Sequence, residues 1–170
     1  MTVEYRDAGP ADAALVADLF ARSFGETFAH LYKPEDLAAF LADQVNEAGF
    51  AAELANPAFD IRLAEVDGTA VGFAKLGNAS LPVETPPDTL ELWQIYVLNQ
   101  WQGSGIGPAL FDWAARLARE RGGRHLQLTV YVDNHRAKSF YERRGFVEVG
   151  RYDFMVGNHA DEDIIMRAAL

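Results

Sequence analysis

The chain has 170 residues, of which 49% are hydrophobic and 24% charged, a balance typical of a globular protein with a sizeable core. Fifteen basic against twenty-five acidic side chains give a formal net charge of −10, which argues against a nonspecific nucleic-acid-binding protein, because such proteins need a cationic surface. The absence of cysteine excludes disulfides, a thiolate nucleophile and a zinc–thiolate cluster, and no apolar run approaches transmembrane length.

From the length, the charge and the apolar runs we expect a single domain over residues 1–170 that contacts neither nucleic acid nor membrane. We expect it to be cytoplasmic, because the sequence opens with neither a basic segment nor an apolar signal core. The acidic excess would attract a cationic small substrate, although it would serve solubility equally well.

The first sixty residues are expected to form one short strand and a group of helices. Asp12 is placed to cap the first helix, and Pro34 is well suited to the first turn of the second. Residues 25–32 lack a decisive hydrophobic period and are predicted to be a turn or an irregular helical extension. The expected elements are a strand over 2–6 and helices over 12–24, 34–45 and 49–55.

The hydrophobic period changes from helical to strand-like at residue 60. Asp67-Gly68 is the strongest hairpin signal in the chain. The proline-rich connection 78–88 is too irregular for a regular element, and crossing the surface is favoured over a role as a lid. Gly145 is placed to end a short helix. The expected strands cover 61–66, 70–76, 90–97, 126–132, a strand starting at 146–149, and 164–166; the expected helices run from Pro108 to Gly122 and from Asn134 to Gly145.

The stretch 102–108 lies between an expected strand and an expected helix and has three glycines in five residues. Such a turn can point backbone N–H groups inward, and the following helix adds the positive end of its dipole. This indicates an anion site, with phosphate favoured, although the turn could simply connect strand and helix. A Walker A loop is excluded because Gly107-Pro108 carries no lysine, and the dinucleotide pattern is excluded because its third glycine falls on Pro108 or Leu110.

Gln102, Gly105 and Gly107 fill the pattern Gln/Arg-x-x-Gly-x-Gly/Ala, which resembles the pyrophosphate loop of the GCN5-related N-acetyltransferases. The order of elements over 60–170 is similar to that family, whereas the first 60 residues match it loosely. The resemblance implies an α/β (α+β, three-layer) fold with a mixed, mostly antiparallel, splayed sheet flanked by helices. It also implies acetyl-CoA as cosubstrate and no metal.

The resemblance further implies how the cofactor would be held. The loop would bind the pyrophosphate, a bulge in the preceding strand would free backbone groups for the pantetheine arm, and the N–H of Val97 would polarise the thioester carbonyl. Asn134 would contact the coenzyme through its amide, and Lys138 or Ser139 would reach the phosphate or pantetheine end. The expected cofactor-binding residues are Ile95, Tyr96, Val97, Gln102, Gly103, Ser104, Gly105, Ile106, Gly107, Asn134, Ala137 and Ser139. Without the resemblance, residues 95–97 would be interpreted simply as part of a strand, with no role in cofactor binding.

Two residues are expected to carry the chemistry. An alkylammonium with a pKa of about 10 is free base in only about one molecule in a thousand at neutral pH, so a base must assist attack on the thioester. Glu91 is predicted to be that base through ordered water, although the residue alone could equally be an exposed strand carboxylate; His30 and His125 are weaker alternatives. Tyr141, within the pattern 134–146, matches the family phenol that protonates the leaving sulfur, whereas without the family it would be a core residue.

The acceptor is the least determined part. The stretches 23–32, 92–98 and 154–167 look similar, more loosely, to PaiA-type spermidine/spermine acetyltransferases. We expect direct acetyl transfer to a primary amine of a small molecule, with polyamines leading, by a chain acting alone or as a homodimer. A protein N-terminus or an aminoglycoside are alternative acceptors. A non-catalytic CoA-binding regulator and a generic nucleotide-binding module are the rivals from other classes.

Overall fold

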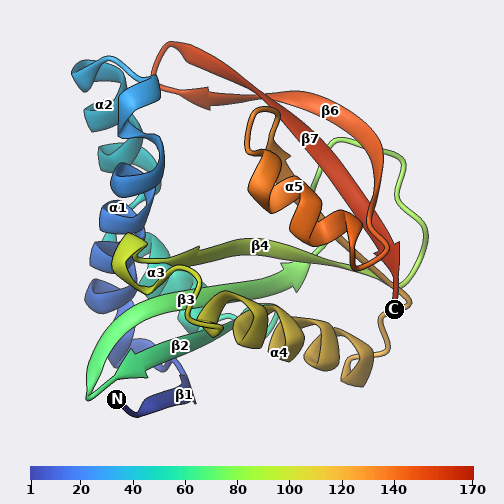
Figure 1. The fold of residues 1–170 in the computed structure, drawn as a ribbon, viewed down its shortest axis with the longest axis horizontal. Helices are drawn as coiled ribbons and strands as arrows, with labels where there is room; N and C mark the ends of the chain where they lie inside the picture. The colour runs from blue at the N-terminus through green and yellow to red at the C-terminus, as the bar shows by residue number, and fades with distance from the viewer.

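Seven strands form one sheet in the order β1-β2-β3-β4-β5-β7-β6 in the computed structural model, which describes residues 1–170 (Figure 1). All neighbouring strands are antiparallel except β4 and β5, so the predicted mixed, mostly antiparallel sheet is confirmed. The strands are β1 (Val3–Asp7), β2 (Asp60–Val66), β3 (Thr69–Asn78), β4 (Thr89–Val97), β5 (His125–Tyr131), β6 (Val147–Val156) and β7 (His159–Ala169). The helices are α1 (Ala13–Phe28), α2 (Pro34–Gln44), α3 (Glu47–Leu54), α4 (Ile106–Glu120) and α5 (His135–Glu142), with short 3-10 turns η1 (Pro10–Asp12), η2 (Ala29–Leu31) and η3 (Asn99–Trp101).

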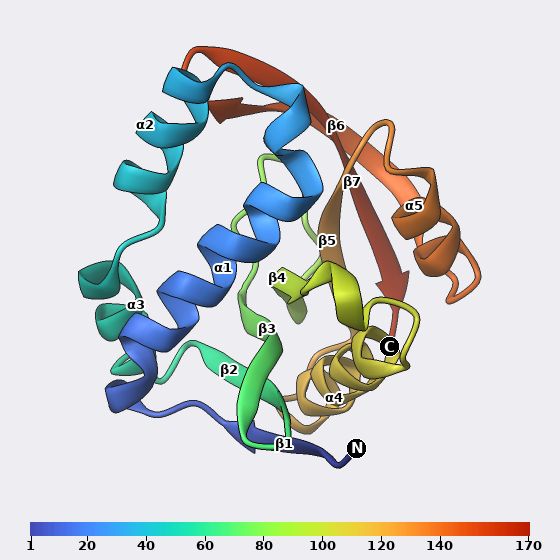
Figure 2. The same cartoon turned by 60° about the vertical axis from the view of Figure 1, so that its left-hand side comes forward.

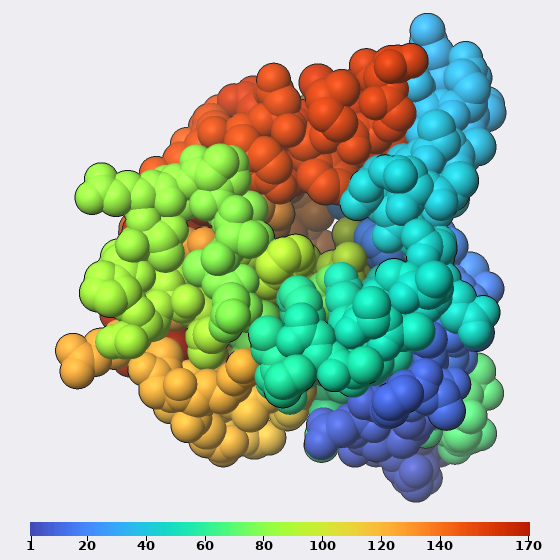
Figure 3. Space-filling model, turned by 180° about the vertical axis from the view of Figure 1, so that it is seen from behind, coloured from blue at the N-terminus to red at the C-terminus, as the bar shows by residue number.

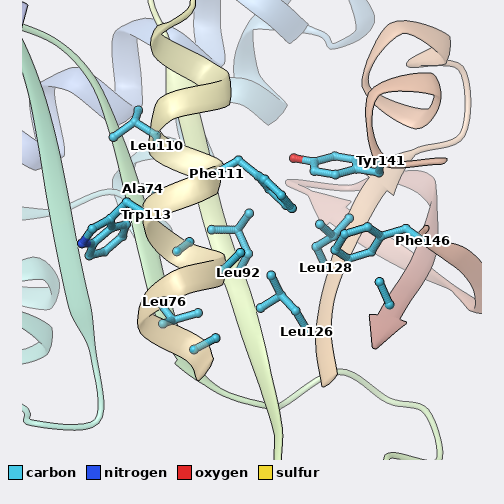
Figure 4. Packing of buried hydrophobic residues seen from close by; sticks show 14 of the residues in the cluster. Ala74, Leu76, Leu92, Leu110, Phe111, Trp113, Leu126, Leu128, Tyr141 and Phe146 are labelled. Carbon is cyan, nitrogen blue, oxygen red and sulfur yellow. The ribbon is translucent and has the colours of Figure 1, made fainter. Parts of the chain in front are cut away.

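Helices cover both faces of the sheet, as Figures 1 and 2 show. Because side chains alternate between the faces of a strand, Phe73 of β3 packs into a cluster with α1, α2 and α3, whereas Ala74 packs into a second cluster under α4 and α5. The apolar stripe of α4 fills this second cluster against β3, β4 and β5 (Figure 4). None of the helices is both long and apolar enough to span a membrane.

The sheet splays between β4 and β5. These strands pair only from Thr89↔His125 to Glu91↔Gln127; beyond that point β4 continues along β3 and β5 continues along β7. In the β3–β4 register Lys75 faces Gln94 but Leu76 faces Leu92, so Trp93 is an extra residue on β4. Such a bulge bends its strand, and a gap opens between the carboxyl ends of β4 and β5.

The β6–β7 hairpin reaches back to α2, as Figure 2 shows. The Asn158 N–H donates to Asp36 Oδ1 at 2.9 Å, and Gly157 adopts φ +57° where a Cβ would lie 2.6 Å from the Cα of Asp36. Residues 146–149 were expected only to start a strand; β6 extends to Val156 although half of its residues are exposed. The hairpin therefore closes the far side of the gap against the N-terminal helices.

Two local predictions are resolved by the hydrogen bonds. Asp12 precedes α1 but does not cap it, because its carboxylate accepts from Gly9 N at 2.8 Å and pairs with Arg6 at 2.9 Å. Of the two alternatives for residues 25–32, the helical extension holds, since α1 continues to Phe28 and η2 follows.

Candidate functional site

A cleft of about 610 Å³ occupies the gap between β4 and β5. Its walls come from β4, β5 and α5 on one side, from the N-terminal helices and the β6–β7 hairpin on the other, and from residues 80–82. Figure 3, which views the molecule from behind, shows a hollow bounded by the red β6–β7 hairpin, the cyan to teal α2 and α3, and the green segment 78–88. Helices α4 and α5 lie on the opposite side, nearest the viewer in Figure 1.

The backbone of β4 is partly unpaired where it borders this cleft. Leu98 N donates to Val71 O at 2.9 Å, and the register pairs Phe73 with Tyr96, so antiparallel alternation turns the N–H and C=O of Val97 away from β3. Ile95, two residues earlier on β4, likewise turns its N–H and C=O away from β3. Tyr96 differs from its expected backbone role, because its main-chain groups face β3 and only its side chain lines the cleft.

The glycine loop has the backbone geometry of an anion site. Gly103 and Gly105 adopt φ of +80° and +91°, a region that favours glycine, and α4 begins at Ile106. The N–H groups of Gly103, Gly105, Ile106 and Gly107 donate to no protein acceptor. Ile106 is 1% exposed because its side chain packs in the core, so only its backbone N–H is placed to bind a ligand. Ser104 differs from the others, because its N–H and Oγ both donate to Trp101 O, at 3.3 and 2.5 Å.

A cation that sequence reasoning missed lies beside this loop. Arg136, in the first turn of α5, donates from Nη1 to Gln102 Oε1 at 3.3 Å, and its Nη2 lies 4.0 Å from a Cβ built at Gly103. Gln102 in turn donates to Val97 O at 3.3 Å and joins the loop to the end of β4. The available signal was the position of Arg136 within the motif 134–146, two residues after the cap of α5.

The structure brings most of the predicted site residues to one cleft. Asn134 caps α5 by accepting from Ala137 N at 3.3 Å, which uses its Oδ1 and leaves its NH₂ free. The predicted residues that line the cleft are Glu91, Ile95, Tyr96, Val97, Gln102, Asn134, Ala137 and Tyr141. The predicted loop residues that follow Gln102 lie outside its lining: Gly103, Ser104, Gly105, Ile106 and Gly107. Ser139, which is exposed, and Lys138, which pairs with Glu142, also lie outside it. So do both alternative histidines, His30 and His125.

Tyr141 is both a core residue and a cleft residue. Its ring is 7% exposed and packs against Phe111 and Phe146, with centroids 5.9 and 5.5 Å away. In Figure 4 its oxygen points away from Phe146 and lies on the side of Phe111. The hydroxyl forms no hydrogen bond within the protein, and burial raises the pKa of this phenol, so it carries a proton at neutral pH.

Glu91 lies at the point where β4 and β5 part. It is 4% exposed, so the alternative of an exposed strand carboxylate is wrong. Its Oε2 accepts from Ser80 N at 2.7 Å, and the Ser80 hydroxyl lies 3.3 Å from each carboxylate oxygen. Burial raises the pKa of Glu91, and the Ser80 donors partly offset this effect. The same bonds hold the 78–88 connection against the cleft, which residues 80–82 line, so it does more than cross the surface.

Two aspartates of β7 also line the cleft, and sequence reasoning did not assign them. Tyr32 OH donates to Asp161 Oδ2 in a short hydrogen bond, and His159 Nε2 lies 3.1 Å from Asp161 Oδ1. Asp163 is 8% exposed and has no hydrogen-bond partner in the protein. Burial, and then the neighbouring Asp161, raises the pKa of Asp163 to about 7. The available signal in the sequence was the spacing of Asp161 and Asp163, because residues two apart on a strand point to the same face and both precede the apolar run 164–166.

The cation among the residues lining the cleft, Lys75, is already neutralised. Its side chain is 3% exposed, and its ammonium lies 2.9 and 2.8 Å from the two carboxylate oxygens of Glu53. Phe50, Phe59 and Trp93 surround the same ammonium, with ring centroids 5.1 to 5.6 Å away. The charged groups lining the cleft are Glu53, Glu91, Asp161, Asp163 and Lys75, so its uncompensated charge is negative.

Comparisons with known proteins agree with this geometry. Residues 15–146 match the model of the acetyltransferase (GNAT) family. An uncharacterised N-acetyltransferase from Lactobacillus delbrueckii subsp. lactis is 33% identical over 149 residues, covering 87% of this chain and 86% of its own length. A putative ribosomal protein bS18 alanine N-acetyltransferase from Bacillus subtilis is 26% identical over 137 residues, 80% of this chain and 85% of its own.

The fold is also that of solved acetyltransferases. The crystal structure of PaiA N-acetyltransferase from Thermoplasma acidophilum in complex with coenzyme A superposes with a TM-score of 0.80 at 21% identity, and each chain is covered completely.

Proposed function

The chain belongs to the acetyltransferase (GNAT) family and is an acetyl-CoA-dependent N-acetyltransferase, and we propose that its acceptor is a cationic small-molecule amine, foremost a polyamine. The observation that carries the proposal is the charge of the cleft: Glu91, Asp161 and Asp163 face it, and the cation Lys75 is paired with Glu53. A charged ammonium entering this space would meet carboxylates and no competing free cation.

The aromatic wall of the cleft supports the same acceptor class. Phe24 and Tyr32 stack with centroids 5.9 Å apart, and Phe28, Phe40 and Phe154 line the cleft around them. Aromatic faces attract ammonium groups, and the methylene chain of a polyamine would pack on the same rings.

The chain's own groups fit the cofactor. The free N–H groups of the glycine loop and the guanidinium of Arg136 are donors of the kind that bind pyrophosphate, and the outward N–H and C=O groups of β4 suit the amides of pantetheine. Acetyl-CoA supplies the acetyl group as a thioester. Val97 N–H would stabilise the oxygen of the tetrahedral intermediate, and Tyr141 would give its proton to the departing sulfur.

A protein N-terminus is the second candidate acceptor. It is supported by the Bacillus subtilis relative, whose name assigns it the alanine of a ribosomal protein. An N-terminal ammonium carries the same charge as a polyamine nitrogen, so the two acceptor classes differ in the chain attached to the nitrogen rather than in the reacting group.

An acceptor panel tests the proposal. Release of the CoA thiol would be followed at fixed acetyl-CoA with spermidine, spermine, 1,4-diaminobutane, an aminoglycoside and a short peptide that begins with alanine. We expect the highest kcat/KM with a polyamine and faster turnover for longer polycations. Turnover of the alanine peptide alone would support the second candidate, and turnover of only a neutral or anionic amine would contradict the charge argument.

A further inference from the structure

Asp163 lies across the gap from the end of β4. It pairs with Tyr131 on β5 and with Tyr152 on β6, so these three side chains share one face. The last paired residues of the parallel strands β4 and β5 are Glu91 and Gln127. Tyr131 lies four residues beyond Gln127 on β5, so it is level with Ile95, four residues beyond Glu91 on β4. If the extra residue Trp93 is left out of the count, Tyr131 is level with Tyr96. Asp163 thus lines the same cleft as Ile95 and Val97, the residues of β4 whose outward N–H groups would hold the thioester, and faces them across the gap.

Glu91 is further from that stretch. It lies four residues before Ile95, and four residues at about 3.3 Å each place it about 13 Å back along the strand. Its carboxylate is also occupied by Ser80 N and Oγ. Glu91 therefore sits at the closed end of the splay, where it holds the 78–88 connection.

The environment of Asp163 leaves its carboxylate available. The titratable groups that face it are Tyr96 from β4, Tyr131 from β5, Tyr152 from β6, Tyr32 from the end of η2, and Asp161 from β7. None of these is a cation, and Asp161 is already bound by Tyr32 and His159. A buried carboxylate without any donor is costly in an apolar site, and an ammonium would relieve that cost.

Asp163 and Tyr141 approach the gap from opposite faces of the sheet. Ile164 of β7 packs into the core with Tyr141 under α4 and α5, so its neighbour Asp163 must point to the other face, toward the hollow of Figure 3. Burial, and then the charge of Asp163 and the neighbouring Tyr141, raise the pKa of the Tyr96 hydroxyl, which lies within electrostatic reach of both. A proton acceptor and a proton donor thus flank the end of β4.

We infer that Asp163, rather than Glu91, is the catalytic base that takes the proton of the acceptor ammonium. The inference rests on the proposed function only in requiring an amine acceptor. In the step, the Asp163 carboxylate takes one proton from R–NH₃⁺, and the nitrogen attacks the thioester carbon. The N–C bond forms and the C–S bond breaks. Tyr141 protonates the sulfur and is reprotonated with the second proton lost by the nitrogen. The proton on Asp163 leaves to solvent, so each turnover yields the amide, CoA thiol and one proton.

The pH profile of kcat/KM tests this assignment, with whichever amine of the panel is turned over fastest. For the wild type we expect a rise to about pH 7 and a plateau until the amine itself deprotonates near pH 10. Asp163→Asn should lower kcat/KM by about 10²- to 10⁴-fold at pH 7, and its rate should then rise about tenfold per pH unit with the free-base fraction of the amine. The variant should therefore approach the wild type near pH 10.

Two controls make the outcome decisive. Glu91→Gln should retain the plateau, and Asp153→Asn, an exposed carboxylate of β6, should leave the whole profile unchanged. The affinity of Asp163→Asn for CoA, measured by calorimetry, should match that of the wild type and show that the donor site is intact. A plateau that persists in Asp163→Asn, or one that is lost in Glu91→Gln, would overturn the inference. A failure of polyamines as acceptors would appear in the panel and leave this test valid with another amine.

Discussion

Replacing Asp163 with asparagine should make the ligand-free protein more stable above about pH 7. Burial and then Asp161 raise the pKa of this carboxyl from 3.8 to about 7, so the folded chain holds the proton more tightly than the unfolded chain does. The contribution of this carboxyl to the free energy of unfolding should therefore fall as pH rises from about 4 to about 7, and the deficit is fully present above pH 7. Asparagine has no charge to desolvate, so the variant should lack this fall.

The two pKa values set the size of the effect. At about 1.36 kcal/mol per pKa unit, the difference between 3.8 and about 7 corresponds to an upper limit of about 4 kcal/mol. Because Asp163 borders an open cleft, water stabilises part of its charge, and we expect roughly half of that limit, about 2 kcal/mol, at pH 8. In a chain of this length such a gain raises Tm by about 4 to 8 °C.

Urea denaturation followed by tryptophan fluorescence would measure the free energy of unfolding of both proteins at pH values from 5 to 9, without CoA. The difference between Asp163→Asn and the wild type should grow from pH 5 to pH 7 and then level off. Asp153→Asn, exposed on the neighbouring strand, should show no such growth. A variant that is equally stable at pH 8, or whose advantage is the same at pH 5, would refute the claim that the folded protein disfavours this charge.

Three further substitutions probe the rest of the site. Tyr141→Phe should lower kcat by about ten- to a thousandfold with little change in the Kd of CoA by calorimetry, because the ring remains packed and only the proton donor is lost; an unchanged kcat would leave Tyr141 a core residue alone. Gly105→Ala places a side chain at φ +91°, which costs about 1 to 3 kcal/mol, and the Kd of CoA should rise at least about tenfold, whereas Gly9→Ala, where a Cβ meets nothing within 4 Å, should bind normally. Glu53→Ala leaves the Lys75 ammonium buried and should lower the free energy of unfolding in urea by about 3 kcal/mol; the double variant with Lys75→Met should recover part of this loss, and no recovery would contradict the pairing argument.

In the proposed function, the splay would give the two substrates separate approaches. The glycine loop and Arg136 stand beside α4 and α5, whereas the acidic and aromatic wall faces the hollow between the β6–β7 hairpin and the N-terminal helices (Figures 1 and 3). Both approaches end at the outward N–H groups of β4. Separate entry suits direct attack, because the amine can reach the thioester without displacing the cofactor.

The sequence by itself determined the features that depend on local backbone chemistry. The Asp67-Gly68 hairpin, the turn of positive φ at Gly103 and Gly105, and the cap at Asn134 each arise from a few neighbouring residues whose conformational preferences can be read directly. The sequence also located Tyr141 and Glu91 on the cleft, although only through the resemblance to a family.

Only the tertiary structure decided which residues face the proposed acceptor path. Asp161 meets Tyr32 across 129 residues, and Asp163 reaches the level of Ile95 because β7 inserts between β5 and β6. Alternation along a strand shows which residues share a face, but it carries no information on which strand lies alongside or in which register. From the sequence alone, the acidic residues 161–163 before the apolar run 164–166 would be interpreted as solvent-exposed surface. The burial that shifts the pKa of Asp163 exists only in the folded chain.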